Sequence, residues 1–128
     1  SAADYGLTDP LSEPEQNERE TLQHEAHCGA MPADMLPVMV ELQRFRDAVL
    51  ARTALGALEQ TGGPVVVITG NGHARRDWGA PVYLERVSDV RIFALALAEH
   101  GVGSGKFDAV ELVPEVARDD PCLAFRKE

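Results

Sequence analysis

The sequence predicts an α/β fold with a mainly parallel sheet flanked by helices, as an incomplete part of a larger α/β domain. The run Pro64–Thr69 (PVVVIT) is continuously apolar and β-branched, which is typical of a strand buried on both faces of a parallel sheet. Helical and strand patterns follow one another in the order helix, strand, helix, strand, strand, which is typical of α/β proteins. Three strands are few for a sheet, so we expect the sheet to be completed outside this sequence.

Each element has its own sequence signal. Ser12 and Glu15 form a capping-box pattern, which predicts a helix over 13–27. A longer helix is predicted over 34–60, with Pro37 in its first turn and apolar residues at spacings of three and four. The remaining predicted elements are a helix over 80–86, strands over 90–97 and 107–113, and a tail over 117–128. The predicted organisation is an irregular lead-in over 1–11 and a single α/β domain over 12–128.

The composition is that of an acidic globular protein. The 128 residues are 45% hydrophobic and carry a formal net charge of -9 at pH 7. An acidic chain without a basic stripe argues against nucleic acid as a partner and against binding to an anionic membrane surface. No apolar run approaches the roughly 18 residues that a membrane span requires.

The stretch 68–84 (ITGNGHARRDWGAPVYL) carries the strongest chemical signal. It follows the carboxyl end of the predicted strand at 64–69, where ligands bind in open α/β sheets. Gly70 and Gly72 are expected to allow a turn with positive φ and the close approach of a ligand to the backbone. His73 can act as a proton donor, a proton acceptor or a metal ligand near neutral pH.

The charged residues after His73 extend this candidate site. Arg75 and Arg76 can hold a carboxylate or a phosphate, and Asp77 can orient His73 or one of the arginines. The alternative interpretation is a tight turn in which the arginines are solvated and His73 caps the next helix. The pattern is not a phosphate-binding fingerprint, so it leaves both interpretations open.

The cysteines allow more than one interpretation. His24, His27 and Cys28 have a spacing that places metal ligands on one helical face, but no fourth ligand is evident. Surface histidines beside a structural cysteine are the alternative. Cys28 and Cys122 are the only cysteines, and they are either free thiols or one long-range disulfide.

Two further groups of polar residues are weaker candidates. Gln43, Arg46 and Asp47 share one side of the long predicted helix, where a solvated stripe is the favoured interpretation. Tyr5 and Tyr83 are the only phenols. Either can ligate iron if its oxygen faces a pocket, whereas a partly buried tyrosine more often serves packing.

The segments HCGAMPADMLPVMVELQRFRDAVLARTAL, PVVVITGNGHARRDWGAPVYL and DPCLAFR together resemble the ChaN-like family of haem-binding uptake proteins, related to the Tiki proteases and erythromycin esterases. The resemblance implies an exported bacterial protein, often a lipoprotein. The wider superfamily is similar in having two Gly-x-x-His motifs that face one cleft. Gly70 and His73 match the second motif, with Arg75 as its companion. No other histidine follows a glycine by three positions, so the sequence looks like the C-terminal portion of a family member.

The resemblance implies haem binding for iron and haem uptake in the bacterial cell envelope, at a periplasmic or outer-envelope location. The iron ligand would be His73 or Tyr83. The implied cofactor-binding residues are Gly70, Gly72, His73, Arg75, Arg76 and Tyr83. The implied partner is haem, with a possible homodimer, no nucleic acid, and membrane attachment only through a lipid anchor outside this sequence. Export also implies a disulfide between Cys28 and Cys122.

An alternative from the same superfamily is a metal-dependent or histidine-based hydrolase. His73 would then act as a ligand or a base, and Arg75 would stabilise an oxyanion, with a divalent metal as the cofactor. A binding protein is favoured over an enzyme.

Overall fold

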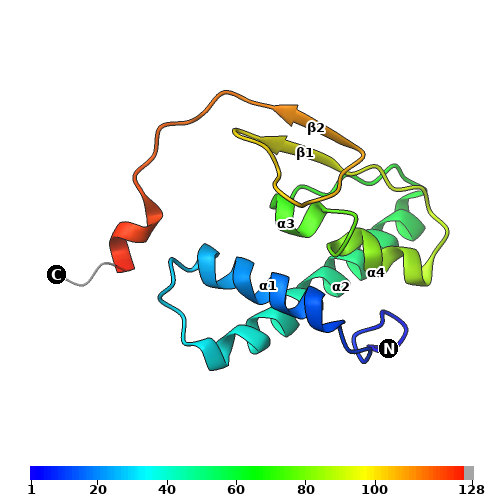
Figure 1. The fold of residues 1–128 in the computed structure, drawn as a ribbon. Coiled ribbons are helices and arrows are strands. Elements are labelled where there is room, and N and C mark those ends of the chain that lie inside the picture. Colours follow the sequence, from blue (N-terminus) through cyan, green and yellow to red (C-terminus); the bar gives the residue numbers. More distant parts are fainter. Residues whose placement is uncertain (126–128) are drawn as a thin grey trace. The chain divides into compact units, whose positions relative to one another are not determined.

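The computed structural model describes residues 1–125, and 126–128, the end of the predicted tail, lie outside the described residues. The elements follow in the order α1, η1, α2, α3, α4, β1, β2 and η2 (Figure 1). They form two compact units: unit 1 contains Ser1–Asp9 and Arg44–Glu115, and unit 2 contains Pro10–Gln43 and the described residues from Val116 onward. None of the helices within 1–125 is long and apolar enough to cross a membrane.

The predicted first helix is confirmed as α1, Glu13–Ala26. Ser12 is its N-cap residue, but its side chain makes no capping hydrogen bond. Glu15 instead accepts a hydrogen bond from Nε of Arg19, one turn later, at 3.0 Å. The helix is thus supported by side-chain pairs four residues apart rather than by a capping box.

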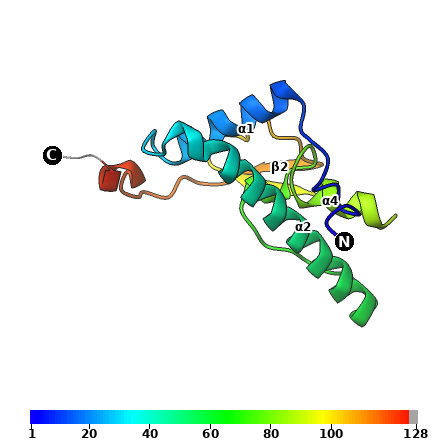
Figure 2. The ribbon, with the colours of Figure 1, turned by 90° about the horizontal axis from the view of Figure 1, so that it is seen from below.

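The long predicted helix is confirmed as α2, Leu36–Thr61, which is one continuous helix (Figure 2). The short 3-10 helix η1, Ala33–Met35, precedes it, so the α-helix begins two residues later than predicted. Its buried apolar positions include Leu36, Val40, Ala48 and Ala51. Gly62 follows the helix with φ of +77°, a conformation in which glycine commonly ends helices.

The core of unit 1 lies between α2 and α4. Helix α4, Ala80–Val87, confirms the helix predicted over 80–86. Ala48, Ala51 and Tyr83 are buried together, and Tyr5 and Leu7 pack against them. The side chain of Arg44 holds the beginning of the chain on α2, because its Nη2 donates to the carbonyls of Gly6 at 2.9 Å and Asp9 at 2.7 Å. The first nine residues are thereby part of a packed unit.

A two-stranded parallel sheet confirms the predicted fold class, an α/β protein with a parallel sheet. Strand β1, Leu95–Ala98, pairs with β2, Ala109–Leu112, and Leu95 lies opposite Ala109 (Figure 1). These strands fall at the end of the predicted strand over 90–97 and inside that over 107–113. Alternate residues of β1 are buried, as a strand with one covered face requires.

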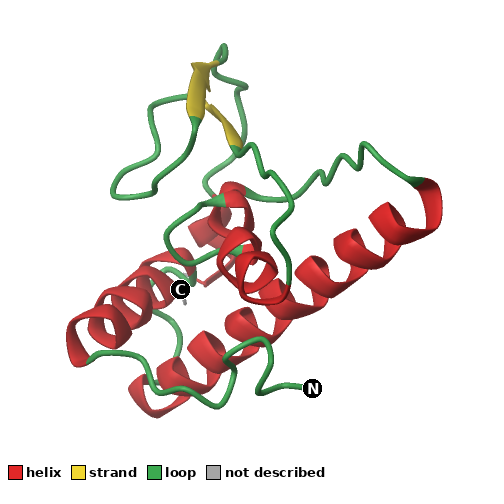
Figure 3. Ribbon diagram, turned by 90° about the vertical axis from the view of Figure 1, so that its right-hand side faces the viewer, coloured by secondary structure: helices red, strands yellow, loops and turns green. Residues whose placement is uncertain are grey.

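The prediction of a strand over Pro64–Thr69 is wrong. In the structure this segment is a loop between α2 and α3 and forms no strand (Figure 3). Val66 is 83% exposed and Ile68 is 95% exposed, so these side chains are not buried on both faces. Its β-branched composition favours extended backbone, but a strand also needs a neighbouring strand, and within residues 1–125 the sheet pairs only β1 with β2.

A disulfide crosses unit 2. Cys28 and Cys122 are bonded, with 5.5 Å between their Cα atoms and 94 positions between them in the sequence. Cys122 lies in the 3-10 helix η2, Pro121–Phe125, within the segment predicted as a tail. The bond implied by the family resemblance is present in the structure.

Candidate functional site

The glycine and histidine motif folds into one helical turn, α3, Asn71–Ala74, beside the carboxyl end of β1. The side-chain amide of Asn71 donates to the carbonyl of Leu97 in β1 at 2.9 Å. Further along, the backbone N–H of Arg76 donates to the carbonyl of Lys106 at 2.7 Å. The first bond places the beginning of the motif toward the carboxyl ends of the parallel strands, and the second attaches Arg76 to the segment that precedes β2, at their amino ends.

The prediction that Gly70 and Gly72 allow a turn with positive φ is wrong. Gly70 has a φ of -67°, and Gly72 lies inside α3 without a positive φ. The chain changes direction through a right-handed helical turn, so no left-handed residue is needed here. A Cβ added at either position would meet no atom within 4 Å. The open space beside both glycines leaves room for a ligand to approach the backbone.

His73 is held by a carboxylate of α2 that the sequence did not assign to it. Its Nδ1 lies 2.7 Å from Oδ1 of Asp47. The side chain of Asp47 is 4% exposed, whereas that of His73 is 26% exposed. The solvated interpretation of Asp47 is therefore wrong, because this side chain is bonded to His73 and is withdrawn from solvent. Its neighbour Arg46 is exposed, as a solvated stripe predicts.

Arg75 is buried in a polar cluster of its own. Its Nε and Nη2 donate to the two carboxylate oxygens of Asp77 at 2.7 and 2.5 Å, and its guanidinium lies 3.5 Å from the ring centroid of Trp78. Burial acts to raise the pKa of Asp77, but the hydrogen bonds from Arg75 and from the Lys106 N–H hold this pKa below its ordinary value. Asp77 therefore orients an arginine, one of the two predicted roles, and not His73.

Arg76 joins the motif to α4 and to the segment just before β2. Its side chain pairs with Glu85 of α4 and, through Nη1 at 3.1 Å, with Asp108 just before β2. Asp108 also accepts the N–H of Ala94 at 2.7 Å. That backbone hydrogen bond and the contact with Arg76 lower the pKa of Asp108. The guanidinium of Arg76 is thus occupied by ion pairs with Glu85 and Asp108, which attach the motif to α4 and to the segment before β2.

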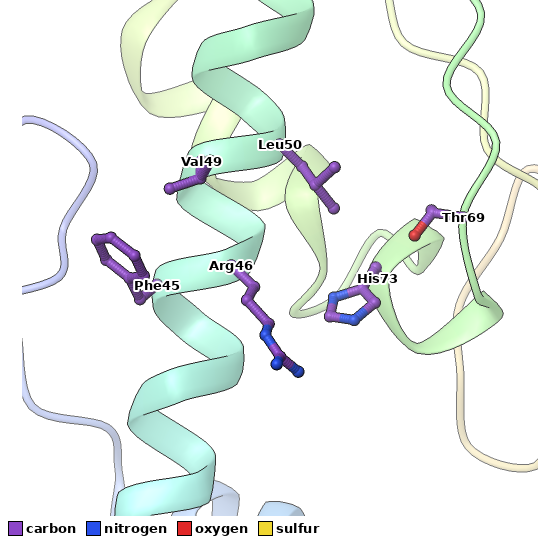
Figure 4. Close-up of a pocket in the computed structure, with 6 residues that line it drawn as sticks. All are labelled: Phe45, Arg46, Val49, Leu50, Thr69 and His73. Carbon is purple, nitrogen blue, oxygen red and sulfur yellow. The ribbon is translucent and has the colours of Figure 1, made fainter.

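An open pocket of about 320 Å³ lies between α2 and the motif. Figure 4 shows Arg46 and Leu50 on the side of α2 that faces His73 and Thr69, with Phe45 and Val49 on the opposite side of the helix. The residues that line the pocket are Phe45, Arg46, Val49, Leu50, Thr69 and His73. Its volume is at the small end of the range of about 300–1,000 Å³ that is common for ligand sites.

The pocket brings together only part of the predicted site. His73 lines it, whereas Arg75, Arg76 and Tyr83 do not. Tyr83 is 4% exposed and packs in the core of unit 1. Sequence reasoning did not assign Phe45, Val49 and Leu50 to a pocket, although the spacing of four residues between Phe45 and Val49 on one helix was an available signal.

The histidines of unit 2 do not form a metal site with Cys28. The sulfur of Cys28 is in the disulfide, and Nδ1 of His27 lies 2.8 Å from the carbonyl of Gln23 in its own helix. Within the part of the chain that the structure describes, no three histidine, cysteine or acidic side chains are grouped so that they could hold a metal ion.

The fold and the site define an α/β protein whose histidine, supported by a buried carboxylate, lines a mainly apolar pocket beside α2. Residues 1–84 match the family model described as haem-binding uptake, Tiki superfamily, ChaN. This match covers more than half of the 128 residues, so the chain belongs to this family. It includes α1, α2 and the whole of the motif around His73. No curated protein and no solved structure matches the chain.

Proposed function

We propose that this chain binds haem through His73 and serves iron and haem uptake in the bacterial cell envelope. The observation that carries the proposal is the imidazole of His73 in the wall of an apolar pocket, held through Nδ1 by Asp47. The family description gives the same ligand class. Haem iron supplies an open coordination position that an imidazole nitrogen can fill.

The pocket supplies part of what haem requires. A porphyrin needs apolar contacts for its faces, a ligand for its iron and cations for its propionates. On the side of α2 that faces the motif, Leu50 supplies apolar surface and the exposed Arg46 supplies a cation, and His73 supplies the nitrogen.

Other candidate residues fit haem less well. Arg75 and Arg76 are already in ion pairs, and the phenol ring of Tyr83 is buried in the core. We therefore favour His73 over Tyr83 as the iron ligand and Arg46 as the partner of a propionate. Gly70 and Gly72 stay candidates for contact with haem, since the space beside each is open.

Titration with haemin tests the proposal. The wild-type protein should shift the Soret band of haemin, and His73→Ala should weaken binding at least about 10-fold, because even the partners of metal-ligating histidines affect affinity by 10–100-fold. His100→Ala is the matched control, because His100 is an exposed histidine of the same unit with only a 3.6 Å contact to Glu115. Equal affinity of the two variants would count against His73, and no Soret shift with the wild type would refute haem binding.

An envelope location is part of the proposal. The Cys28–Cys122 disulfide supports it, because such bonds persist in oxidising compartments and are rare in the reducing cytosol. A lipid anchor and a homodimer stay predictions from the family resemblance. Fractionation of cells that express the native gene, with immunodetection of the protein, would test the location.

A histidine-based hydrolase is the second candidate, and one observation favours it. A carboxylate bonded to a histidine is also the arrangement that orients a general base, and Thr69 lines the same pocket with a hydroxyl group. Arg75 is less suited to its predicted role at an oxyanion, since its guanidinium is bonded to Asp77 and stacked on Trp78. Hydrolysis of a chromogenic ester that His73→Ala abolishes would favour this candidate, whereas an inactive wild type that binds haemin would exclude it for esters.

A further inference from the structure

Helix α2 carries apolar residues on two of its faces. One face is buried in the protein, where Val40 and Ala51 are each 1% exposed. The other face is open to solvent, where Val38 is 55% exposed and Phe45 is 56% exposed. A helix with apolar residues on more than one face is normally covered on each of them, because apolar surface in contact with water is unfavourable. The open face of α2 therefore indicates a surface that another helix covers.

The exposed and half-exposed apolar residues form a single stripe, which we call the α2 stripe. It consists of Met35, Val38, Leu42, Phe45 and Val49. Met35 is the last residue of η1, and the others belong to α2. The spacings alternate between three and four residues, which is the pattern of the a and d positions of a coiled coil. Figure 4 shows Phe45 and Val49 on the side of α2 opposite His73, so the stripe faces away from this histidine.

Charged side chains lie on the two flanks of the stripe. With Leu42 at an a position, Glu41 occupies a g position and Arg46 an e position, and both side chains are exposed. In a parallel pair of helices, the g residue of one helix lies beside the e residue of the following heptad of the other. Two copies of α2 would therefore bring Glu41 of each copy to Arg46 of the other, and by symmetry this contact occurs twice.

The opposite orientation is electrostatically unfavourable. An antiparallel pair brings the g positions of the two helices together, so Glu41 would face Glu41 or Asp34 of the other copy. Like charges in such positions repel, whereas the parallel arrangement joins opposite charges. The charges of α2 are thus complementary to a second α2 in the parallel orientation.

We propose that the α2 stripe is the interface through which two copies of this chain form a dimer with parallel α2 helices. The stripe supplies the apolar surface that association removes from water. The paired Glu41 and Arg46 side chains select a second copy as the partner and set its orientation, which is the role of e and g charges in coiled coils.

Arg46 has two alternative partners in this arrangement. It lines the pocket, where we assign it to a propionate of haem, and in the dimer it meets Glu41 of the second copy. Haemin and the second copy would then compete for the same guanidinium. The dimer is therefore measured without haemin, so the result stands whether or not the protein binds haem.

The first test measures the molar mass of the full chain by sedimentation equilibrium in the absence of haemin. A stripe of few residues predicts a weak dimer, with a dissociation constant between roughly 1 μM and 1 mM. The average molar mass should rise from the monomer value toward the dimer value across these concentrations. A molar mass that stays at the monomer value throughout would overturn the proposal.

Val38→Glu and Val66→Glu are a matched pair of variants for this test. Each replaces an exposed valine by an acid, but Val38 belongs to the stripe and Val66 lies in the loop between α2 and α3. Val38→Glu places two like charges together inside the interface, so it should raise the dissociation constant at least about 10-fold. Val66→Glu should leave it unchanged. Equal dissociation constants for the two variants would overturn the proposal.

The second test exchanges the flanking charges. Glu41→Lys brings cations together on each flank and Arg46→Glu brings acids together, so each variant should raise the dissociation constant roughly 10-fold. The two variants mixed in equal amounts should associate with wild-type affinity, because opposite charges then meet again on both flanks. The double variant should recover wild-type affinity for the same reason.

This second test also decides the orientation of the helices. In an antiparallel dimer, Glu41→Lys would exchange one pair of like charges for another and would not weaken association. Wild-type affinity of Glu41→Lys would therefore refute the parallel dimer. Circular dichroism of each variant distinguishes a loss of association from a loss of fold.

Discussion

Gly79 is the residue of the motif that tolerates a side chain least. A Cβ at this position would lie 2.4 Å from the carbonyl oxygen of His73 and 2.6 Å from that of Arg75. Both atoms are backbone, so the loop itself must move. We expect Gly79→Ala to lower the free energy of unfolding by about 1–3 kcal/mol, the usual effect of overpacking. Urea denaturation of the wild type and of Gly79→Ala measures this difference in the free energy of unfolding.

Gly72→Ala is the matched control for this prediction. The added Cβ meets no atom within 4 Å, and the residue lies in a helical turn. The unfolding free energy should stay unchanged or rise by up to about 1 kcal/mol, because alanine favours helix over glycine. Equal destabilisation by both substitutions would show that the close contacts at Gly79 do not determine its tolerance.

At the scale of single residues, the sequence predicted a contact between residues that are neighbours along the chain. Arg75 and Asp77 are two positions apart, so their pairing required no knowledge of the fold. Asp47 belongs to a helix that precedes the motif, and its burial and its contact with His73 depend on the tertiary fold. The same pattern of polar residues along a helix fits a solvated stripe equally well, so sequence alone favoured the wrong interpretation of Asp47.

At the scale of elements, two carboxylates join the motif to the strands. Asp77 accepts the N–H of Lys106, and Asp108 accepts the N–H of Ala94, just before β1. Each carboxylate also contacts an arginine of the motif. The charged forms of these acids therefore hold the loop and the sheet together.

The lowered pKa values of Asp77 and Asp108 predict that the folded protein loses stability at low pH. The folded-state pKa of Asp77 and that of Asp108 lie below the ordinary value of 3.8. Their stabilisation is thus fully present above about pH 4 and is lost as pH falls through the folded-state pKa values. Urea denaturation between pH 2.5 and 6, roughly the range that brackets this transition, should show the fall. Compared with the wild type, Asp77→Asn should have a lower unfolding free energy at pH 6, and this free energy should fall less as the pH is lowered.

Asp89→Asn is the control for the acid series, because Asp89 is exposed in the same unit. It should follow the wild-type curve. If Asp77→Asn loses stability in acid as steeply as the wild type does, the carboxylate of Asp77 does not contribute to the transition.

The helices could be predicted more completely than the sheet for a physical reason. Capping residues, proline position and apolar spacing are local, and α1, α2 and α4 lie close to the predicted ranges. A strand exists only beside another strand. Residues 64–69 have strand composition, yet within residues 1–125 the sheet contains β1 and β2 alone. Composition therefore predicted extended backbone at this segment but not its pairing.

At the scale of the whole molecule, the division into two units could not be predicted from composition. One of the boundaries along the chain falls between Gln43 and Arg44, inside the continuous helix α2. No glycine, proline or polar linker marks it, because the helix backbone runs through both units. Unit 2 also combines Pro10–Gln43 with the described residues from Val116 onward, and the Cys28–Cys122 bond joins these two segments covalently.

The disulfide of unit 2 should contribute strongly to stability. It connects residues 94 positions apart, so it restricts most of the unfolded chain. The chain-entropy model gives roughly 4.7 kcal/mol for a loop of this length. Urea denaturation of the oxidised protein should therefore give an unfolding free energy higher by about that amount than in the presence of reductant. Reductant should have no effect on Cys28→Ser, which already lacks the bond. Equal stability of the oxidised and reduced wild type would contradict the prediction, as would two free thiols by mass spectrometry of the native protein.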